Sequence, residues 1–553
     1  MPVLFKVRKW LDDEEFQELI KIADYLGYEA GYKLFRVNVD KAVKHGYVLE
    51  DVKSLLEEYA AEIEGSLEDL EEAFKEYYPF FEWVSSKGVV RIHVPRVVYN
   101  AVKENLRKQS FKYAGVLDNK VIIEVLPYYA HEIAKSFENA GLKVVDASNI
   151  LSEKPLILRP ELKGVSLRPY QEDALSKWIE NNHRGIIALP TGAGKSLIAI
   201  AAIVKTAVRT LIVAYTKEQV FQWQNFLLKY TTIPPSMIGL FYGEEKRLAP
   251  ITITTYQSGF RNINTLSPYF TMLVVDEVHH LPADKFKYIA LHSLATFRMG
   301  LSATPIREDG KHEELFPLLG GIVYYKPPSE LVEEGFLAPY RIVTVKVKLT
   351  PQERALYEEL KKRYRALVDG KKFQEVLEAA RQGDMRAVEA LRVHSNMKML
   401  LARSSAKIEK AVELALEEFK KGNKVIVFTQ YVDQAKEISS RLNGLLLTGE
   451  IPEAERKKVL ETFKRSEQSI LVVTTVGDEG LDIPDANVGI IVSGTGSRRQ
   501  FVQRLGRLLR PKSRGVYAVL YEIVLEKTPE EYQAKKRKTD MLEMDNVLSL
   551  EDQ

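Results

Sequence analysis

Cysteine is absent from this sequence of 553 residues. Disulfide bonds, zinc ribbons and cysteine-bound iron–sulfur clusters are therefore excluded. Long hydrophobic runs are missing too, since no apolar stretch approaches the roughly 20 residues that a membrane-spanning helix needs. The N-terminal residues lack the pattern of a secretion signal and soon meet Asp12 and Asp13. We therefore expect a cytoplasmic protein with no membrane partner.

A strong net charge is missing as well, because the formal charge is only +3 at pH 7. The distribution of charge is more informative than the total. The segment from Asp51 to Glu76 is acidic, whereas the segment from Arg498 to Arg514 is basic. The chain is too long for one compact core, and its length predicts roughly three to five domains.

The most informative segment that is present reads LPTGAGKS and covers residues 189–196. Apolar runs at 185–188 and 197–203 predict a buried strand before it and a helix after it. A glycine-bearing loop between a strand and a helix cradles phosphate, because backbone N–H groups and the helix N-terminus attract anions. We expect Lys195 to reach the β- and γ-phosphates of ATP and Ser196 to bind Mg²⁺. The loop residues expected to contact the nucleotide are Thr191, Gly192, Ala193, Gly194, Lys195 and Ser196.

Two adjacent carboxylates follow a second apolar strand, predicted at 272–275. Binding sites in α/β proteins form where the strands of the sheet end. We expect Asp276 to hold Mg²⁺ through water and Glu277 to polarise the water that attacks ATP. His279 is expected to sense the γ-phosphate or to connect this segment to the next motif.

These segments, taken with others in order, resemble the motifs of superfamily 2 helicases. The segment RPYQ at 168–171 resembles the adenine-reading motif, and SAT at 302–304 resembles the motif that couples hydrolysis to motion. The other matching segments are AYTK at 214–217, TTYQ at 254–257, VFTQ at 427–430, TTVGDEGLD at 474–482 and QRLGRLLR at 503–510. Each short motif is weak evidence, but their joint order is specific.

The resemblance implies a role for each matching residue. Gln171 is the expected reader of adenine, and the other expected nucleotide contacts are Arg168, Gly480 and Asp482. The residues expected to contact DNA are Lys217, Thr255 and Thr475, and those expected to couple hydrolysis to motion are Ser302 and Thr304. The expected catalytic residues of the last motif are Gln503, Arg507 and Arg510. Arg507 and Arg510 are three residues apart on a predicted helix and therefore share a face. Their planar guanidinium groups suit the γ-phosphate and its developing charge. ATP would then lie between two domains and draw them together.

One helicase family is favoured by a triplet and an insertion. Arg307, Glu308 and Asp309 follow the coupling motif directly, and a lysine- and arginine-rich helical segment occupies 351–403. Both features resemble the XPB family of DNA repair and transcription helicases. The resemblance implies duplex opening at the triplet, a DNA-contacting thumb at the insertion and 3′ to 5′ translocation in nucleotide excision repair. It also implies a partner nuclease of the archaeal type and a damage-recognition domain near 81–160.

Strands and helices alternate over most of the chain. This pattern predicts an α/β protein with two RecA-like parallel-sheet domains, a helical thumb insertion and N-terminal α/β accessory domains. The expected boundaries are 1–80 for an accessory module of unknown role, 81–160 for a small α/β domain, 161–350 and 404–530 for the two RecA-like domains, 351–403 for the thumb and 531–553 for a charged tail. Within the small domain we expect strands at 89–94, 120–125 and 142–145 and helices at 99–107 and 130–140.

Two other functions share parts of this pattern. A branch-migration or restriction-type translocase on double-stranded DNA would have the same two-domain core, but the triplet and the thumb favour the XPB-like interpretation. A non-catalytic scaffold that only binds DNA is the less favoured alternative, because the expected catalytic residues are all present.

Overall fold

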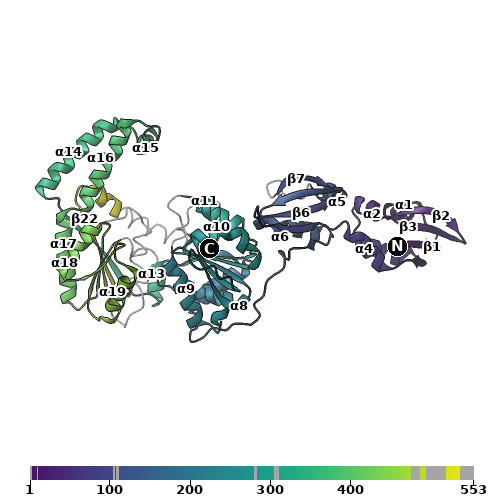
Figure 1. Ribbon diagram of the computed structural model, residues 1–553, viewed down its shortest axis with the longest axis horizontal. Helices are drawn as coiled ribbons and strands as arrows, with labels where there is room; N and C mark the ends of the chain where they lie inside the picture. The colour runs from purple at the N-terminus through teal and green to yellow at the C-terminus, as the bar shows by residue number, and fades with distance from the viewer. Residues whose placement is uncertain are drawn as a thin grey trace.

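The computed structural model describes residues 3–8, 10–103, 106, 111–278, 283–303, 310–474, 486–493 and 518–535. Its parts follow one another along the long axis of the molecule (Figure 1), from an N-terminal module through a second module to two larger domains. Within these ranges, no helix has the length and apolar character needed to cross a bilayer.

The N-terminal module is an antiparallel sheet with helices on one face. Its elements are β1 (Leu4–Val7), α1 (Asp13–Ile22), β2 (Ala23–Glu29), β3 (Tyr32–Val37), α2 (Val39–Lys44), α3 (Leu49–Tyr59), β4 (Glu62–Glu64) and α4 (Leu67–Lys75). The strand order is β2-β3-β1-β4. Phe5 and Phe35 are opposite each other in the sheet and their rings stack 5.2 Å apart, so they anchor the core under α1. The acidic segment from Asp51 to Glu76 covers most of α3 together with β4 and α4.

The second module is a mostly antiparallel sheet with two helices. Its elements are β5 (Phe80–Val84), β6 (Val89–Pro95), α5 (Arg96–Val102), β7 (Phe111–Leu117), β8 (Lys120–Val125), α6 (Pro127–Asn139) and β9 (Val145–Asp146). The strand order is β7-β8-β6-β5-β9. The strands expected at 89–94 and 120–125 are confirmed. The helix expected at 99–107 instead begins at Arg96, where Pro95 ends the preceding strand.

The two accessory modules share one hydrophobic core. A continuous cluster of buried side chains runs from Val3 to Ile150. Val48 of the first module packs against Gly141 of the second so closely that a Cβ on Gly141 would lie 2.7 Å from Val48 Cγ1. The expected boundary at residue 80 therefore falls between two sheets but does not separate two cores.

The third unit is a parallel sheet covered by helices on both faces (Figure 1). Its elements are α7 (Pro169–Glu180), β10 (Arg184–Ala188), α8 (Lys195–Thr206), β11 (Thr210–Ala214), α9 (Lys217–Tyr230), β12 (Ile238–Phe241), β13 (Ile251–Thr255), α10 (Tyr256–Leu266), β14 (Met272–Val275), α11 (Ala283–Leu291), β15 (Phe297–Ser302), α12 (His312–Leu315), β16 (Ile322–Tyr325) and α13 (Pro328–Glu333). The strand order is β12-β13-β11-β14-β15-β10-β16. Neighbouring residues alternate between the two faces: Ile212 packs on the α8–α9 side and Val213 on the α10–α11 side.

The fourth unit is a second parallel sheet. Its elements are β17 (Tyr340–Val347), α17 (Ser405–Lys420), β18 (Val425–Phe428), α18 (Val432–Leu442), β19 (Leu445–Leu447), α19 (Glu453–Arg465), β20 (Ile470–Val473), β21 (Val488–Ile491) and β22 (Ala518–Leu525). The strand order is β17-β22-β21-β18-β20-β19. The structure moves the expected boundary at residue 350, because β17 pairs along its whole length with β22 and thus belongs to the second sheet.

The thumb projects from the second sheet as a helical arm (Figure 1). It consists of α14 (Pro351–Val368), α15 (Phe373–Arg381) and α16 (Met385–Ala402). A break between α15 and α16 falls at Gly383, which has a φ of +91°, and Asp384 caps α16 by accepting from Arg386 N at 2.9 Å. Glu353 joins the two ends of the arm, because its carboxylate accepts from Ser405 N at 2.7 Å. The thumb therefore leaves and rejoins the sheet at one place.

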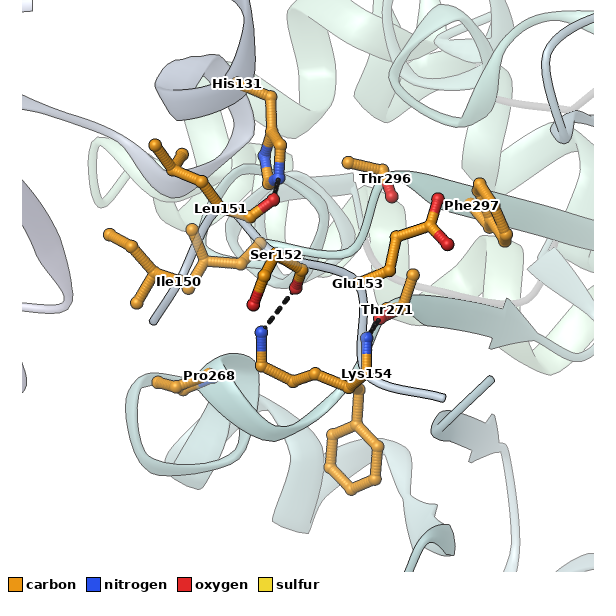
Figure 2. A pocket seen from close by; sticks show the side chains of 12 residues that line it. His131, Ile150, Leu151, Ser152, Glu153, Lys154, Pro268, Thr271, Thr296 and Phe297 are labelled. Atoms are coloured by element: carbon orange, nitrogen blue, oxygen red, sulfur yellow. Dashed lines mark hydrogen bonds between the residues drawn. The ribbon is translucent and has the colours of Figure 1, made fainter. Parts of the chain in front are cut away.

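The second module docks on the first parallel-sheet domain through a buried arginine. Arg298, in β15, is 2% exposed. Its guanidinium donates to the carbonyl oxygens of Ala290, Ser293, Ala295 and Leu318 and lies 4.6 Å from the centroid of the Tyr128 ring. A cavity of about 190 Å³ lies beside this contact, between α6, residues 150–154 and the domain surface (Figure 2). His131 and Lys154 both hydrogen-bond backbone carbonyls there, and burial lowers the pKa of each.

Replacing Arg298 with methionine is expected to destabilise this domain by roughly 3 kcal/mol or more, because it leaves four buried carbonyl oxygens without their donor. The thermal unfolding midpoint should fall by on the order of 10 °C. Arg261→Met, at an exposed position of α10, is the matched control and should leave the midpoint almost unchanged. Equal midpoints for the two variants would contradict this account of the contact.

Candidate functional site

The phosphate loop lies at the carboxyl end of β10, between that strand and α8. Leu189 N donates to Ser302 O at 3.0 Å, so the start of the loop is tied to the end of β15. Gly192 and Gly194 have φ values of +92° and +80°, which side chains other than glycine rarely adopt. Lys195 follows as the first residue of α8. The strand, loop and helix expected from the sequence are confirmed.

The polar groups of the loop point into it. Lys195 is 8% exposed, and its Nζ donates to Leu189 O at 2.9 Å. Thr191 Oγ1 is buried and has no hydrogen-bond partner within the described residues. A buried hydroxyl seldom remains unsatisfied in a native protein. A buried cation, an orphaned hydroxyl and a helix N-terminus form a donor set that fits the phosphates of ATP.

Gln171 is tied to the phosphate loop by both ends of its carboxamide. Its Oε1 accepts from Arg168 N at 2.9 Å, and its Nε2 donates to Ala193 O at 2.9 Å. Arg168 donates to Phe336 O at 3.1 Å and lies over the Phe336 ring. Gln171, the expected adenine reader, therefore lies against the phosphate loop, and Arg168 lies against the segment that leads to the second domain. Adenine reading stays a prediction.

Gly194→Ala is expected to disturb this arrangement. The new Cβ would lie 2.4 Å from Gln171 Nε2, and the φ of +80° would be strained for alanine. We expect a fall in free energy of unfolding of roughly 1–2 kcal/mol together with weaker ATP binding, measured by calorimetric titration. Gly243→Ala is the control, because a Cβ there meets nothing within 4 Å. Unchanged ATP binding by the Gly194 variant would contradict the expected close fit of the loop.

The paired carboxylates lie at the end of β14, which is separated by β15 from β10, the strand that leads into the phosphate loop. Asp276 N donates to Val213 O at 2.9 Å, and the Asp276 side chain is deeply buried. Burial and the charge of the neighbouring Glu277 raise the pKa of Asp276 to about 6. The hydrogen bond from Trp223 and the positive charge of Lys195 act in the opposite direction and lower this pKa. Glu277 has a φ of +47°, a conformation that is costly for a residue with a side chain and is often found at functional sites.

The other described candidates lie at the same edge of the sheet, since all its strands are parallel. Ser302 ends β15, is fully buried and pairs with Ala188 beside the phosphate loop. Lys217 begins α9 after β11, and its Nζ lies 3.2 Å from Glu244. Thr255 ends β13 and caps α10 by accepting from Ser258 N. The fold thus brings Ser302, Lys217 and Thr255 to the edge that carries Lys195 and Asp276, and their roles in coupling and DNA contact stay predictions.

Several expected site residues lie outside the described residues. They are His279, Thr304, Arg307, Glu308, Asp309, Thr475, Gly480, Asp482, Gln503, Arg507 and Arg510. Their assigned roles stay predictions.

Sequence reasoning missed two buried polar contacts. Trp223 donates to Asp276 Oδ2 at 2.8 Å, although a tryptophan in an amphipathic helix indicates only a core position. In the second domain, Gln434 accepts from Ser493 Oγ at 2.6 Å and donates to Ala402 O at 3.0 Å. This amide therefore joins the end of the thumb to the end of β21, and no sequence motif signals it.

Two family models match the sequence in separate regions. The model described as Type III restriction enzyme, res subunit, matches residues 164–307, which include the phosphate loop and the paired carboxylates. The model described as ERCC3/RAD25/XPB C-terminal helicase matches residues 386–545, which include most of the second parallel-sheet domain.

Individual relatives match over most of the chain. The DNA 3'-5' translocase XPB2 of Sulfurisphaera tokodaii is 35% identical over 422 residues, which are 75% of this chain and 93% of that protein. The DNA 3'-5' helicase XPB of Mycobacterium tuberculosis is 30% identical over 453 residues, covering 79% of this chain and 74% of that protein. The crystal structure of the Pyrococcus furiosus Hef helicase domain aligns with a TM-score of 0.47 and 21% identity, covering 67% of this chain and 98% of that chain. By its sequence match to the Sulfurisphaera protein across nearly all of that relative, the chain belongs to the XPB family of superfamily 2 helicases.

Proposed function

We propose that this protein is an ATP-dependent DNA translocase that opens duplex DNA, moving 3′ to 5′ along one strand. The observation that carries the proposal is the convergence of a phosphate loop, the adjacent carboxylates of Asp276 and Glu277, and Ser302 at one edge of the first sheet, in a chain of the XPB family. The names of the relatives, which include DNA 3'-5' translocase and DNA 3'-5' helicase, support the polarity.

Each group at this edge has a part in hydrolysis under the proposal. The loop backbone and Lys195 bind the phosphates, while Ser196 and Asp276 hold Mg²⁺. When bound, Mg²⁺ supplies neutralising charge at the phosphate oxygens. Glu277 orients the attacking water and accepts its proton. Because Leu189 N and Ser302 O are hydrogen-bonded, a change at the phosphates reaches the end of β15 through one main-chain contact.

DNA binding in the proposal depends on the phosphate backbone at single-strand/duplex junctions. Lys217 and the cap at Thr255 would contact the tracking strand, and the basic thumb would contact the duplex. Such binding releases counterions, so affinity should fall steeply as salt rises. We further propose a role in nucleotide excision repair and in transcription, inside the cell near the nucleoid, with a nuclease as partner. The relative in Schizosaccharomyces pombe carries the name General transcription and DNA repair factor IIH helicase/translocase subunit XPB.

The decisive experiment measures ATP hydrolysis and strand displacement on forked and bubble DNA of both polarities. We expect hydrolysis to be stimulated by DNA and displacement to require a 3′ single-stranded tail. Hydrolysis on blunt duplex with no strand displacement would instead favour a restriction-type translocase, the alternative that the match at 164–307 supports. DNA binding without any ATP hydrolysis would indicate the other alternative, a non-catalytic scaffold that only binds DNA.

A further inference from the structure

A buried tryptophan contacts the carboxylate expected to hold Mg²⁺. Trp223 lies in α9 and is 2% exposed, within the core on that side of the sheet. Its indole Nε1 donates to Asp276 Oδ2 at 2.8 Å. An indole N–H can only donate, so this contact suits an ionised carboxylate and cannot be reversed.

The contact completes a pair of fixed donors around Asp276. Glu277 N donates to Oδ1 at 2.9 Å, while Trp223 holds Oδ2. Two donors on the two oxygens fix the plane of the carboxylate before any ligand binds. Each oxygen accepts more than one hydrogen bond or metal contact, so Mg²⁺ coordination and the indole contact are compatible.

We propose that Trp223 is the positioning residue for Asp276, holding its carboxylate in the orientation that binds Mg²⁺ with the nucleotide. This inference rests on the proposed ATP hydrolysis and names a residue that the motifs do not include. Groups that hydrogen-bond a metal ligand typically change metal affinity by roughly 10–100-fold when they are removed. The contact also ties α9, which begins at Lys217, directly to the hydrolysis site.

The chain provides a matched control for a purely structural role. Trp178, in α7 of the same domain, is fully buried, and its Nε1 donates to Arg298 O at 2.9 Å. Trp178→Phe also replaces a buried indole and removes its N–H group. The lost hydrogen bond, however, is to the main-chain oxygen of Arg298, which lies outside the hydrolysis site. Both variants should lose comparable stability, and only one should change the response to Mg²⁺.

The test compares Trp223→Phe and Trp178→Phe in the full chain. Two readouts are the Mg²⁺ concentration that gives half-maximal ATP hydrolysis and the binding of fluorescently labelled ADP at limiting Mg²⁺. For Trp223→Phe we expect the half-maximal Mg²⁺ concentration to rise about 10-fold and labelled ADP to bind less tightly at low Mg²⁺. Trp178→Phe should show the Mg²⁺ dependence of the wild type in both readouts. The same Mg²⁺ dependence in both variants would overturn the assignment, whereas no hydrolysis by the wild type would instead refute the proposed function.

A second measurement avoids dependence on the folding of Trp223→Phe. The wild-type chain contains four tryptophans, so labelling with 5-fluorotryptophan gives four fluorine signals. Single replacement of Trp10, Trp83 and Trp178 assigns the remaining signal to Trp223. That signal should shift when Mg²⁺ is added to the ADP complex, because a cation is then held close to Asp276, the acceptor of the indole N–H. A Trp223 signal that does not respond to Mg²⁺ would refute the contact's role.

Discussion

Lys195→Ala is expected to lower DNA-stimulated ATP hydrolysis by roughly 10²–10³-fold or more. The ammonium group lies inside the phosphate loop, 2.9 Å from Leu189 O, and is almost fully buried. A cation in this position neutralises phosphate charge in a site that excludes water, where electrostatic interactions are strong. Steady-state hydrolysis with and without forked DNA measures the effect, and strand displacement should disappear with it.

Lys205→Ala is the matched control for this variant. Lys205 lies in the last turn of the same helix, α8, and its side chain is exposed. The substitution removes the same charge and shortens the side chain by the same amount as Lys195→Ala. Because Lys205 lies away from the phosphate loop, hydrolysis should remain close to that of the wild type. If Lys195→Ala retained DNA-stimulated hydrolysis at the control's level, the assignment of the phosphate site would be wrong.

The local parts of this site were predictable because short sequence patterns determine them. The loop needs positive φ at Gly192 and Gly194, and a buried strand must precede it, so glycine spacing and an apolar run suffice to locate it. Asp276 and Glu277 were found for the same reason, since they end an apolar strand. The break in the thumb at Gly383 is also local, because glycine and a following capping residue end one helix and begin the next.

The parts that escaped prediction depend on contacts between distant segments. The apolar run of β17 gives no sign of which sheet it joins, and its pairing with β22 spans the whole thumb and the second domain. A charged residue such as Arg298 in a strand predicts an exposed side chain. Arg298 is buried instead, because it donates to four carbonyl oxygens and lies over the Tyr128 ring of another module. The Trp223 contact is invisible for the same reason, because α9 and β14 meet only in the folded domain.

Glu277→Gln is expected to separate ATP binding from hydrolysis. The substitution keeps the size of the side chain but removes its ability to accept a proton from the attacking water. General base catalysis typically contributes roughly 10²–10⁴-fold, so the hydrolysis rate should fall within that range. ATP affinity should stay within a few-fold of the wild type, because the phosphate loop is untouched. Single-turnover hydrolysis and equilibrium binding of labelled ATP measure the two effects separately.

The backbone conformation of Glu277 makes Glu277→Gln a sharper test than a substitution that alters the size or shape of the side chain. The residue has a φ of +47°, and its amide N donates to Asp276 Oδ1, so an altered backbone would also displace the expected Mg²⁺ ligand. Glutamine tolerates the same backbone and preserves that amide contact, and a loss of hydrolysis can then be attributed to the missing base. Glu180→Gln, at the exposed end of α7, removes the same charge away from the site and should hydrolyse ATP normally. Parallel loss of ATP binding and hydrolysis in Glu277→Gln would show that the carboxylate binds the nucleotide complex rather than activating water.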